Sequence, residues 1–377
     1  MKSSKNSMKQ DFDDIRDYDD HEVNGVLLSL LKDSEFLQFL AQQKFPRLQR
    51  LFPTLIQRRI KKTMMRQFKN VHSVQAMQNK LTPLVRSLMD RTVTEFKVTG
   101  LEQLDKNSSY VFISNHRDIA MDPMLVNYAL LNAGLASCKI AIGDNLLERQ
   151  FVAKLMRLNK SFVVQRSPGS RKDKLAAVNK LSAYIHHSVK RGQSIWIAQK
   201  EGRAKDGKDM TDTAVLKMLH MAGRKAGWEF KESMNYLKLV PVSISYEWDP
   251  CDEDKARELD AQRRQGCYEK SKDEDLLSII KGIKGQKGRV SVHFSAPLLQ
   301  DSNTADQWSK AIDHEIHSHY DVFDNHLQAQ ALVSGGGEGD DAMWQKKYGH
   351  LPKPVYQQII ETYAQPAISQ AAAKHYD

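Results

Sequence analysis

The chain has 377 residues, of which 41% are hydrophobic, and carries a formal net charge of +10 at pH 7. This length and hydrophobic content allow one large domain or two modest ones and exclude a chain that is disordered throughout. The excess of positive charge predicts an anionic partner, which can be a nucleic acid, a membrane surface or a phosphorylated substrate.

Residues 1–20 are polar and contain almost no large aliphatic side chains, so they are predicted to form a mobile tail. They also lack the apolar core of a signal peptide. No apolar run in the chain approaches the roughly 18 residues of a membrane span. We therefore expect a soluble or peripheral protein.

The three cysteines, Cys138, Cys251 and Cys267, are far apart and form no Cys-x-x-Cys pair. This pattern predicts neither a disulfide framework nor a zinc site, and it favours a reducing, cytosolic setting.

Residues 21–93 show apolar side chains at helical spacing, and Pro46 and Pro53 divide this region into several helices. The segment 44–69 contains nine cations and no acidic residue, interleaved with apolar side chains. Such a basic amphipathic segment can lie on an anionic bilayer, where each cation near the surface contributes about 1 kcal/mol. The alternative is an ordinary helix with a solvated basic face.

Residues 94–300 alternate between apolar strand candidates and helical patterns. The expected strands are 96–98, 110–113, 138–142, 162–164, 194–198, 237–246 and 289–294. Alternation of this kind predicts an α/β fold with a mostly parallel central sheet and helices on both faces. Residues 249–288 are dense in charge and are predicted to be a surface excursion. Residues 301–377 are predicted to form a C-terminal helical extension, with one helix from Ala305 to about Phe323.

A titratable side chain lies where the second of these strands ends. Tyr110–Ile113 reads as a buried strand, and Asp122-Pro123 opens a helix, so His116 lies in the turn between them. An imidazole flanked by Asp118 and Asp122 can act as a general base that a carboxylate holds in place. An ordinary surface turn, with Asp122 only as a helix N-cap, explains the same residues.

Four strand ends, taken in order, resemble the glycerolipid acyltransferases. They are Asn115-His116 with Asp122-Pro123, then Arg166, then Glu201-Gly202-Arg203, and then Val240-Pro241-Val242 in an apolar strand. The family has Asn-His, four residues and Asp in its first block and Phe-Pro-Glu-Gly-Thr-Arg in its third. Here five residues separate His116 from Asp122, and no Thr precedes Arg203. The resemblance covers roughly residues 94–300.

The resemblance implies transfer of a fatty acyl group from acyl coenzyme A or acyl carrier protein to glycerol 3-phosphate or lysophosphatidate, in phospholipid synthesis. His116 would be the general base, with Asp122 as its carboxylate partner and Asp118 as the alternative. Arg166, Glu201, Gly202 and Arg203 would bind the substrate phosphate. No nucleophile elbow is present, so direct attack by the substrate hydroxyl is expected.

We expect no cofactor beyond the acyl donor and no metal, since the histidines near residue 316 lack HExxH spacing. The expected partners are an anionic membrane surface and a glycerophospholipid precursor, and the expected location is cytoplasmic, peripheral on the inner face of the membrane. A catalytically inactive, membrane-associated relative is an alternative. A basic nucleic-acid-binding protein is another, although the sequence shows neither a helix-turn-helix nor cations interleaved with aromatic residues on a sheet face.

Overall fold

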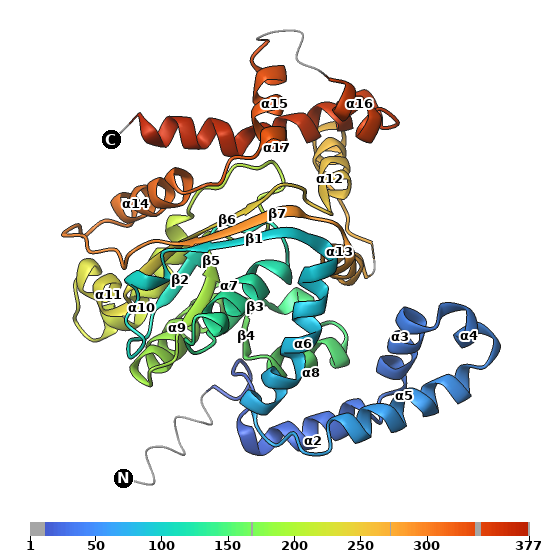
Figure 1. Ribbon diagram of the computed structural model, residues 1–377. Coiled ribbons are helices and arrows are strands. Elements are labelled where there is room, and N and C mark those ends of the chain that lie inside the picture. The colour runs from blue at the N-terminus through green and yellow to red at the C-terminus, as the bar shows by residue number, and fades with distance from the viewer. Residues whose placement is uncertain (1–11, 167–168, 272, 336–340, 376–377) are drawn as a thin grey trace. The chain divides into compact units, whose positions relative to one another are not determined.

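A computed structural model describes residues 12–166, 169–271, 273–335 and 341–375 (Figure 1). The chain divides into two compact units. Unit 1 comprises Met1–Val85 and Lys139–Ala177, and unit 2 comprises Arg86–Cys138 and Val178–Asp377. The predicted domain 94–300 is therefore not continuous within one unit, because its residues 139–177 group with the N-terminal helices.

The first segment of unit 1 is helical, as predicted. Its helices are α2 (Asp20–Leu30), α3 (Ser34–Lys44), α4 (Pro46–Leu51), α5 (Pro53–Gln67) and the first part of α6 (Val74–Thr92). Pro46 is the first residue of α4 and Pro53 is the first residue of α5. The first position of a helix tolerates proline, because its N–H has no partner within the helix. The side chain of Asp33 caps α3 by accepting the N–H groups of Glu35 and Phe36.

The second segment of unit 1 consists of β3 (Lys139–Gly143), the short helix η2 (Asp144–Leu147), α8 (Gln150–Leu158), β4 (Ser161–Val164) and the start of α9 (Arg171–Lys190). Strands β3 and β4 pair in parallel. Phe151 of α8 is buried, and its ring lies 5.8 Å from that of Phe36 and 5.4 Å from that of Phe39. These aromatic contacts explain why the two segments form one unit.

The predicted N-terminal tail differs in part from the structure. Residues 1–11 lie outside the described residues, but Ile15 is buried in unit 1. Its carbonyl accepts the N–H of Val163 at 2.8 Å, and Asp17 pairs with Lys139 at 2.5 Å. A buried apolar side chain, a backbone hydrogen bond and an ion pair thus connect this polar stretch to β3 and β4.

Unit 2 contains a mostly parallel sheet, which confirms the predicted α/β fold class. Its strands lie in the order β1 (Val93–Thr99), β7 (Gly288–Phe294), β6 (Leu239–Tyr246), β2 (Val111–Ser114) and β5 (Ile195–Ala198). The β6–β7 pair is antiparallel and the other pairs are parallel. Every residue of β2 is buried. The carboxyl ends of β2, β5 and β6 therefore lie side by side at one edge.

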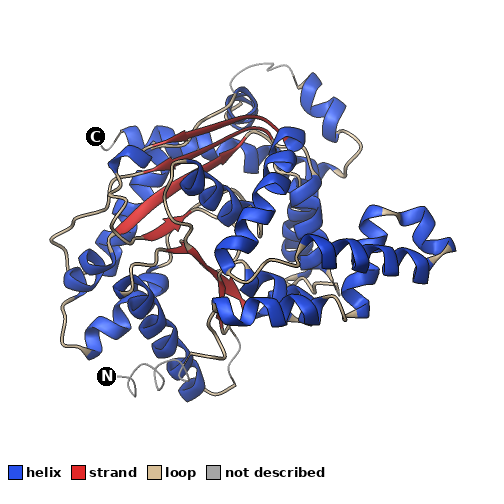
Figure 2. Cartoon of the chain, turned by 60° about the horizontal axis from the view of Figure 1, so that its bottom comes forward, coloured by secondary structure: helices blue, strands red, loops and turns tan. Residues whose placement is uncertain are grey.

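Helices alternate with these strands (Figure 2). Those of unit 2 are η1 (Leu101–Gln103), α7 (Met121–Asn132), the rest of α9, α10 (Thr213–Lys225), α11 (Phe230–Leu237), α12 (Asp252–Gln265), α13 (Glu274–Lys284), α14 (Ala305–Ser318), α15 (Asp324–Val333), α16 (Ala342–Tyr348) and α17 (Lys353–Lys374). Helix α11 was not predicted. The helix predicted from Ala305 to about Phe323 is α14, which starts at Ala305 as predicted and ends at Ser318, and α15 follows it.

The charged region 249–288 is not the surface excursion that its composition predicts. It forms α12 and α13, and Lys255 and Glu258 are buried. Both of these buried charges have a partner, because Lys255 pairs with Asp249 and Glu258 pairs with Lys205. Paired charges can be buried, and composition alone does not show which charges will pair.

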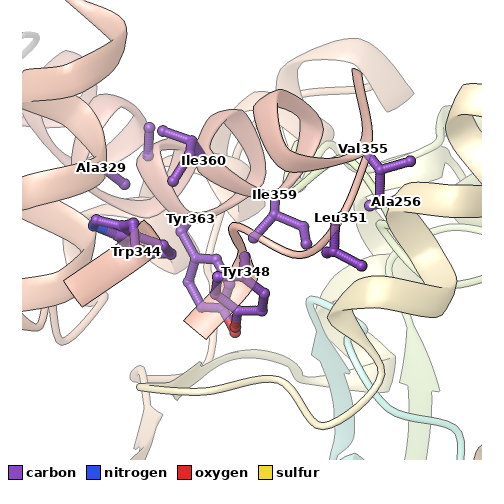
Figure 3. Packing of buried hydrophobic residues seen from close by; sticks show 10 residues of the cluster. Ala256, Ala329, Trp344, Tyr348, Leu351, Val355, Ile359, Ile360 and Tyr363 are labelled. Carbon is purple, nitrogen blue, oxygen red and sulfur yellow. The ribbon is translucent and has the colours of Figure 1, made fainter. Parts of the chain in front are cut away.

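The C-terminal helices have a hydrophobic core of their own. Figure 3 shows this cluster, in which Trp344, Tyr348 and Ile359 of the last two helices meet Ala256 of α12 and Ala329 of α15. The indole of Trp248 lies 5.7 Å from that of Trp344, at the edge of the same cluster. The predicted extension thus packs on the region that follows β6.

Candidate active site

The turn that follows β2 is fixed to the neighbouring strand β6. The side chain of Asn115 donates to the carbonyl of Ile244 at 2.9 Å and accepts its N–H at 2.8 Å. An amide that replaces a strand partner in this way extends the sheet ladder by one residue. His116 is the next residue, so its position at the carboxyl end of β2 is set by the sheet.

His116 contacts Asp122. Its Nδ1 lies 2.8 Å from Oδ2 of Asp122, the side chain of His116 is 14% exposed, and that of Asp122 is fully buried. The imidazole also meets the edge of Trp196 on β5, with ring centroids 5.6 Å apart. A largely buried imidazole whose Nδ1 is held by a buried carboxylate leaves Nε2 as the nitrogen for proton transfer.

Asp122 has several donors besides His116. Its Oδ2 accepts the backbone N–H groups of Arg117 at 2.6 Å and Asp118 at 2.9 Å. Its Oδ1 accepts the hydroxyl of Tyr246 at 2.6 Å. Burial and the nearby charge of Asp122 raise the pKa of Tyr246, which keeps its hydroxyl a donor. Asp122 lies inside the first turn of α7 and is not its N-cap, which is Ala120.

Asp118, the alternative partner of His116, has a different set of contacts. Its Oδ1 accepts the N–H groups of Ala120 at 2.9 Å and Met121 at 2.8 Å, so it satisfies the start of α7. Burial, and next to it the charge of Asp122, raise the pKa of Asp118. Helix α13 comes close here, because a Cβ at Gly282 would lie 1.9 Å from Oδ2 of Asp118.

The loop after β5 carries the predicted phosphate ligands of unit 2. Glu201 is exposed, and Gly202 has φ +78°, a conformation that favours glycine. Nη1 of Arg203 donates to the hydroxyl of Ser278 on α13 at 2.7 Å. The N–H of Ala204 donates to the carbonyl of His116 at 2.9 Å. The structure therefore joins this loop directly to the turn that carries His116.

Comparison with known proteins gives a family match and a similar solved structure. The family model for acyltransferases matches residues 95–245. This segment is thus similar to acyltransferase domains. A search of curated protein sequences finds no match. Among solved structures, the 1-acyl-sn-glycerophosphate (LPA) acyltransferase PlsC from Thermotoga maritima is similar, with 13% identity and a TM-score of 0.40. The match covers 77% of this chain and 92% of that one.

Arg166, the remaining predicted phosphate ligand, belongs to unit 1. It follows β4, its side chain is exposed, and its N–H donates to Asp144 at 3.2 Å. Its guanidinium lies over Gly143, where a Cβ would come within 2.5 Å of Nε. Its place beside His116 stays a prediction.

The sequence analysis missed four residues that contact the turn of His116 or the side chains that hold it. They are Arg117, Asp209, Tyr246 and Tyr320. Tyr246 ends a strand at the same edge as His116, so the strand-end argument could have included it. Arg117 is adjacent to His116 in the sequence. Nothing in the sequence around Arg117, Asp209 or Tyr320 distinguishes these residues from ordinary surface residues.

A buried lysine also reaches the turn of His116. The amine of Lys255 on α12 donates to the carbonyl of Arg117 at 2.5 Å and pairs with Asp249. Burial by itself raises the pKa of Asp249, but the charge and hydrogen bond of Lys255 outweigh it, so the pKa of Asp249 is lowered. The charged region after β6 therefore supports the backbone next to His116.

Two further properties concern the described residues as a whole. Among them, no three His, Cys, Asp or Glu side chains come together in a way that could hold a metal ion. Within the same residues, the helices are all too short or too polar to cross a bilayer.

Proposed function

We propose that this protein transfers a fatty acyl group from a thioester, acyl coenzyme A or acyl carrier protein, to a hydroxyl of glycerol 3-phosphate or lysophosphatidate in phospholipid synthesis. The observation that carries the proposal is the contact between His116 and the buried carboxylate of Asp122 inside a segment that is similar to acyltransferase domains. Acyl transfer to an alcohol needs a base, because a free hydroxyl is a weak nucleophile at neutral pH.

In the proposed mechanism, Nε2 of His116 takes the proton of the acceptor hydroxyl while the oxygen attacks the thioester carbonyl. The tetrahedral intermediate then expels the thiolate, the C–S bond breaks, and the imidazolium returns the proton to sulfur. Asp122 holds Nδ1–H, fixes the tautomer and stabilises the imidazolium. General-base catalysis of this kind contributes about 10²- to 10⁴-fold.

The side chains near the site support direct attack without a covalent acyl-enzyme. The hydroxyl of Ser114 donates to the carbonyl of Asn115 at 2.7 Å and accepts from Trp196 at 3.1 Å, so it is already engaged. Cys251 is buried, and burial raises the pKa of its thiol to about 11. A buried thiol with so high a pKa is a poor nucleophile at neutral pH.

For the acceptor phosphate we propose Arg203 and the backbone at Gly202, with Glu201 orienting the substrate and Arg166 as a second cation. Guanidinium groups suit bidentate phosphate contacts. The hydroxyl of Ser278 already orients Arg203, which supports its assignment. Because the acceptor is anionic, two arginines would also offset its charge.

We also propose that helices α4 and α5 bind the anionic inner face of the cytoplasmic membrane. Six large apolar side chains of this hairpin are exposed: Phe45, Leu48, Leu51, Phe52, Leu55 and Met65. The cations of residues 44–69 are interleaved with them in the sequence, with no acidic residue between. Exposed apolar side chains and unopposed positive charge together match an anionic lipid surface, where lysophosphatidate and the acylated product would lie.

The test is an acyl-transfer assay with glycerol 3-phosphate and with lysophosphatidate, each offered acyl coenzyme A and acyl carrier protein. We expect transfer in at least one combination, and a loss of about 10²-fold or more in His116→Ala. His350→Ala is the matched control, because His350 has an exposed side chain far along the sequence in the C-terminal extension.

Three outcomes would contradict the proposal. Full activity of His116→Ala would exclude the mechanism. Liposome binding without transfer in any combination would favour an inactive membrane-associated relative. Tight, salt-sensitive RNA binding without liposome binding would favour a nucleic-acid-binding protein.

A further inference from the structure

Asp209 lies in the loop after β5, and its carboxylate accepts hydrogen bonds from several donors. Its side chain is completely buried, and its Oδ2 accepts Nη2 of Arg117 at 2.6 Å. The same oxygen accepts the hydroxyl of Tyr320, which follows α14, and lies 3.4 Å from the amide nitrogen of Asn115. The ring of His317 on α14 also contacts the backbone carbonyl of Asp209 at 2.6 Å.

The two donors from the β2 turn lie on either side of His116. Asn115 precedes it and Arg117 follows it, so one carboxylate holds both neighbours of the proposed base. Arg117 extends the connection, because its guanidinium also donates to the carbonyls of Ala204 at 3.3 Å and Gly207 at 3.1 Å. These carbonyls belong to the loop that carries Arg203.

The charges of this pair depend on each other. Burial acts against the charged form of Arg117, but Asp209 raises the pKa of Arg117 above its usual value. A buried cation without its counter-ion destabilises the fold, and so does a buried anion without its cation. The ion pair of Arg117 with Asp209 therefore places two opposite charges together beside the turn of His116.

We propose that Asp209 is a positioning residue of the acyl-transfer site. It fixes His116 through Asn115 and Arg117, it joins that turn to the loop of Arg203, and Tyr320 of the C-terminal extension fixes Asp209 in turn. The inference rests on the proposed function. Asp209 acts on the neighbours of His116 and on the loop, and it does not touch the reacting atoms.

The decisive variant is Asp209→Asn, which keeps the shape of the side chain and removes its charge. We expect kcat to fall about 10- to 100-fold, since small displacements of a catalytic group have effects of this size. The KM of the acceptor should change less than about threefold, because the substrate does not touch Asp209.

The pH profile separates positioning from general damage. The other charged groups near His116 are Asp118 and Asp122 of its own turn and helix, and Lys255 paired with Asp249. None of these changes in the variant, whereas the charge of Arg117 loses its partner. A cation that has lost its partner disfavours a second positive charge nearby, so the acidic limb of kcat/KM should move to lower pH.

Two further variants complete the design. In Arg117→Met, Asp209 loses its counter-ion, so the acidic limb should move to higher pH. In the double variant Arg117→Met/Asp209→Asn both charges are gone, and the limb should return to the wild-type position while kcat stays low. Such opposite shifts that cancel in the double variant are expected only if the pair acts on His116.

Tyr320→Phe serves if the charge variants do not fold, as judged by circular dichroism and thermal unfolding. It removes one donor to Asp209 and leaves the charges, so kcat should fall about threefold or more, with no shift of the limb. Tyr356→Phe is its control, since Tyr356 donates to Asp341 in the same extension.

The outcomes distinguish this inference from the proposed function. If the wild-type protein transfers no acyl group, the proposed function fails. If the wild type is active but folded Asp209→Asn keeps kcat within twofold and the same acidic limb, the positioning role of Asp209 is overturned. If the charge variants do not fold, equal rates for Tyr320→Phe and Tyr356→Phe overturn it as well.

Discussion

The hydroxyl of Tyr246 lies 2.6 Å from Oδ1 of Asp122, and the other oxygen of that carboxylate lies 2.8 Å from Nδ1 of His116. Tyr246 ends β6, and His116 follows β2, the strand beside it. The carboxylate between them is completely buried. Because both of its oxygens are engaged, Asp122 has little freedom to turn away from His116.

Tyr246→Phe should lower kcat about tenfold, because Asp122 loses the donor that orients it. It should also destabilise the fold by about 1–3 kcal/mol, the usual cost of a buried carboxylate oxygen left without its partner. Acyl-transfer rates and urea unfolding measure the two effects. Tyr236→Phe is the control, since its half-buried ring packs on His186. Unchanged kinetics of Tyr246→Phe would show that Asp122 needs no second support.

Asp122→Asn and Asp118→Asn should differ sharply in activity. An amide at position 122 favours the wrong imidazole tautomer and cannot stabilise the imidazolium, so kcat should fall about 10²- to 10⁴-fold. An amide at position 118 can still accept the N–H groups of Ala120 and Met121, so kcat should stay within about threefold. Steady-state kinetics of the pair decide the assignment. A larger loss at position 118 would make Asp118 the functional carboxylate.

Lys287 should make stability depend on pH in the alkaline range. It is fully buried next to β7, and burial lowers its pKa to about 8 from the usual 10.5. Between these values the unfolded chain binds more protons than the folded one. Wild-type stability should therefore fall as the pH decreases from 10.5 to 8 and change no further from this source below 8.

Lys287→Met removes that titration and keeps a side chain of similar length. At pH 7 the variant should be more stable than the wild type by about 1–3 kcal/mol, with the gap closing above pH 8. Urea unfolding between pH 6 and 10 measures it, with the exposed Lys190→Met as control. Parallel stability profiles for wild type and Lys287→Met would mean that Lys287 stays charged when folded.

The double variant Leu51→Glu/Leu55→Glu should lose liposome binding. Both leucines are exposed on the α4–α5 hairpin, at 70% and 64%. We expect binding to vesicles with anionic lipid to weaken about tenfold or more, because apolar area is lost and negative charge is added. Leu175→Glu/Leu299→Glu makes the same chemical change at exposed leucines elsewhere, at 55% and 80%. Equal loss in both variants would point to net charge rather than the hairpin.

Local patterns were sufficient to predict the turn of His116. The apolar run of β2 and the Asp122-Pro123 start of α7 are contiguous in sequence, and each has a local physical cause. The choice between Asp118 and Asp122 was not available from sequence, because it depends on where the backbone N–H groups of the turn point. Asp118 is used by the start of α7, and this leaves Asp122 facing His116.

Contacts between distant segments account for what could not be predicted. Asp209 and Tyr320 are 111 residues apart, and neither has a sequence environment that marks it as buried. Lys255 lies in a run of charges whose composition is typical of a surface, yet its partners bury it. Sequence patterns indicate which residue types prefer the interior. Whether an individual charged residue is buried depends on its ion-pair partners.

The dependence of Asp209 on Tyr320 also has a consequence for how the protein is made. A chain emerging from the ribosome presents His116, Asp122 and the loop of Arg203 long before Tyr320 is synthesised. Asp209 can accept the tyrosine hydroxyl only after the following strand and helices, β7 and α14 among them, have been translated and folded. The centre around His116 is thus completed late in synthesis, and a nascent chain that stops before Tyr320 leaves this carboxylate without one of its buried donors.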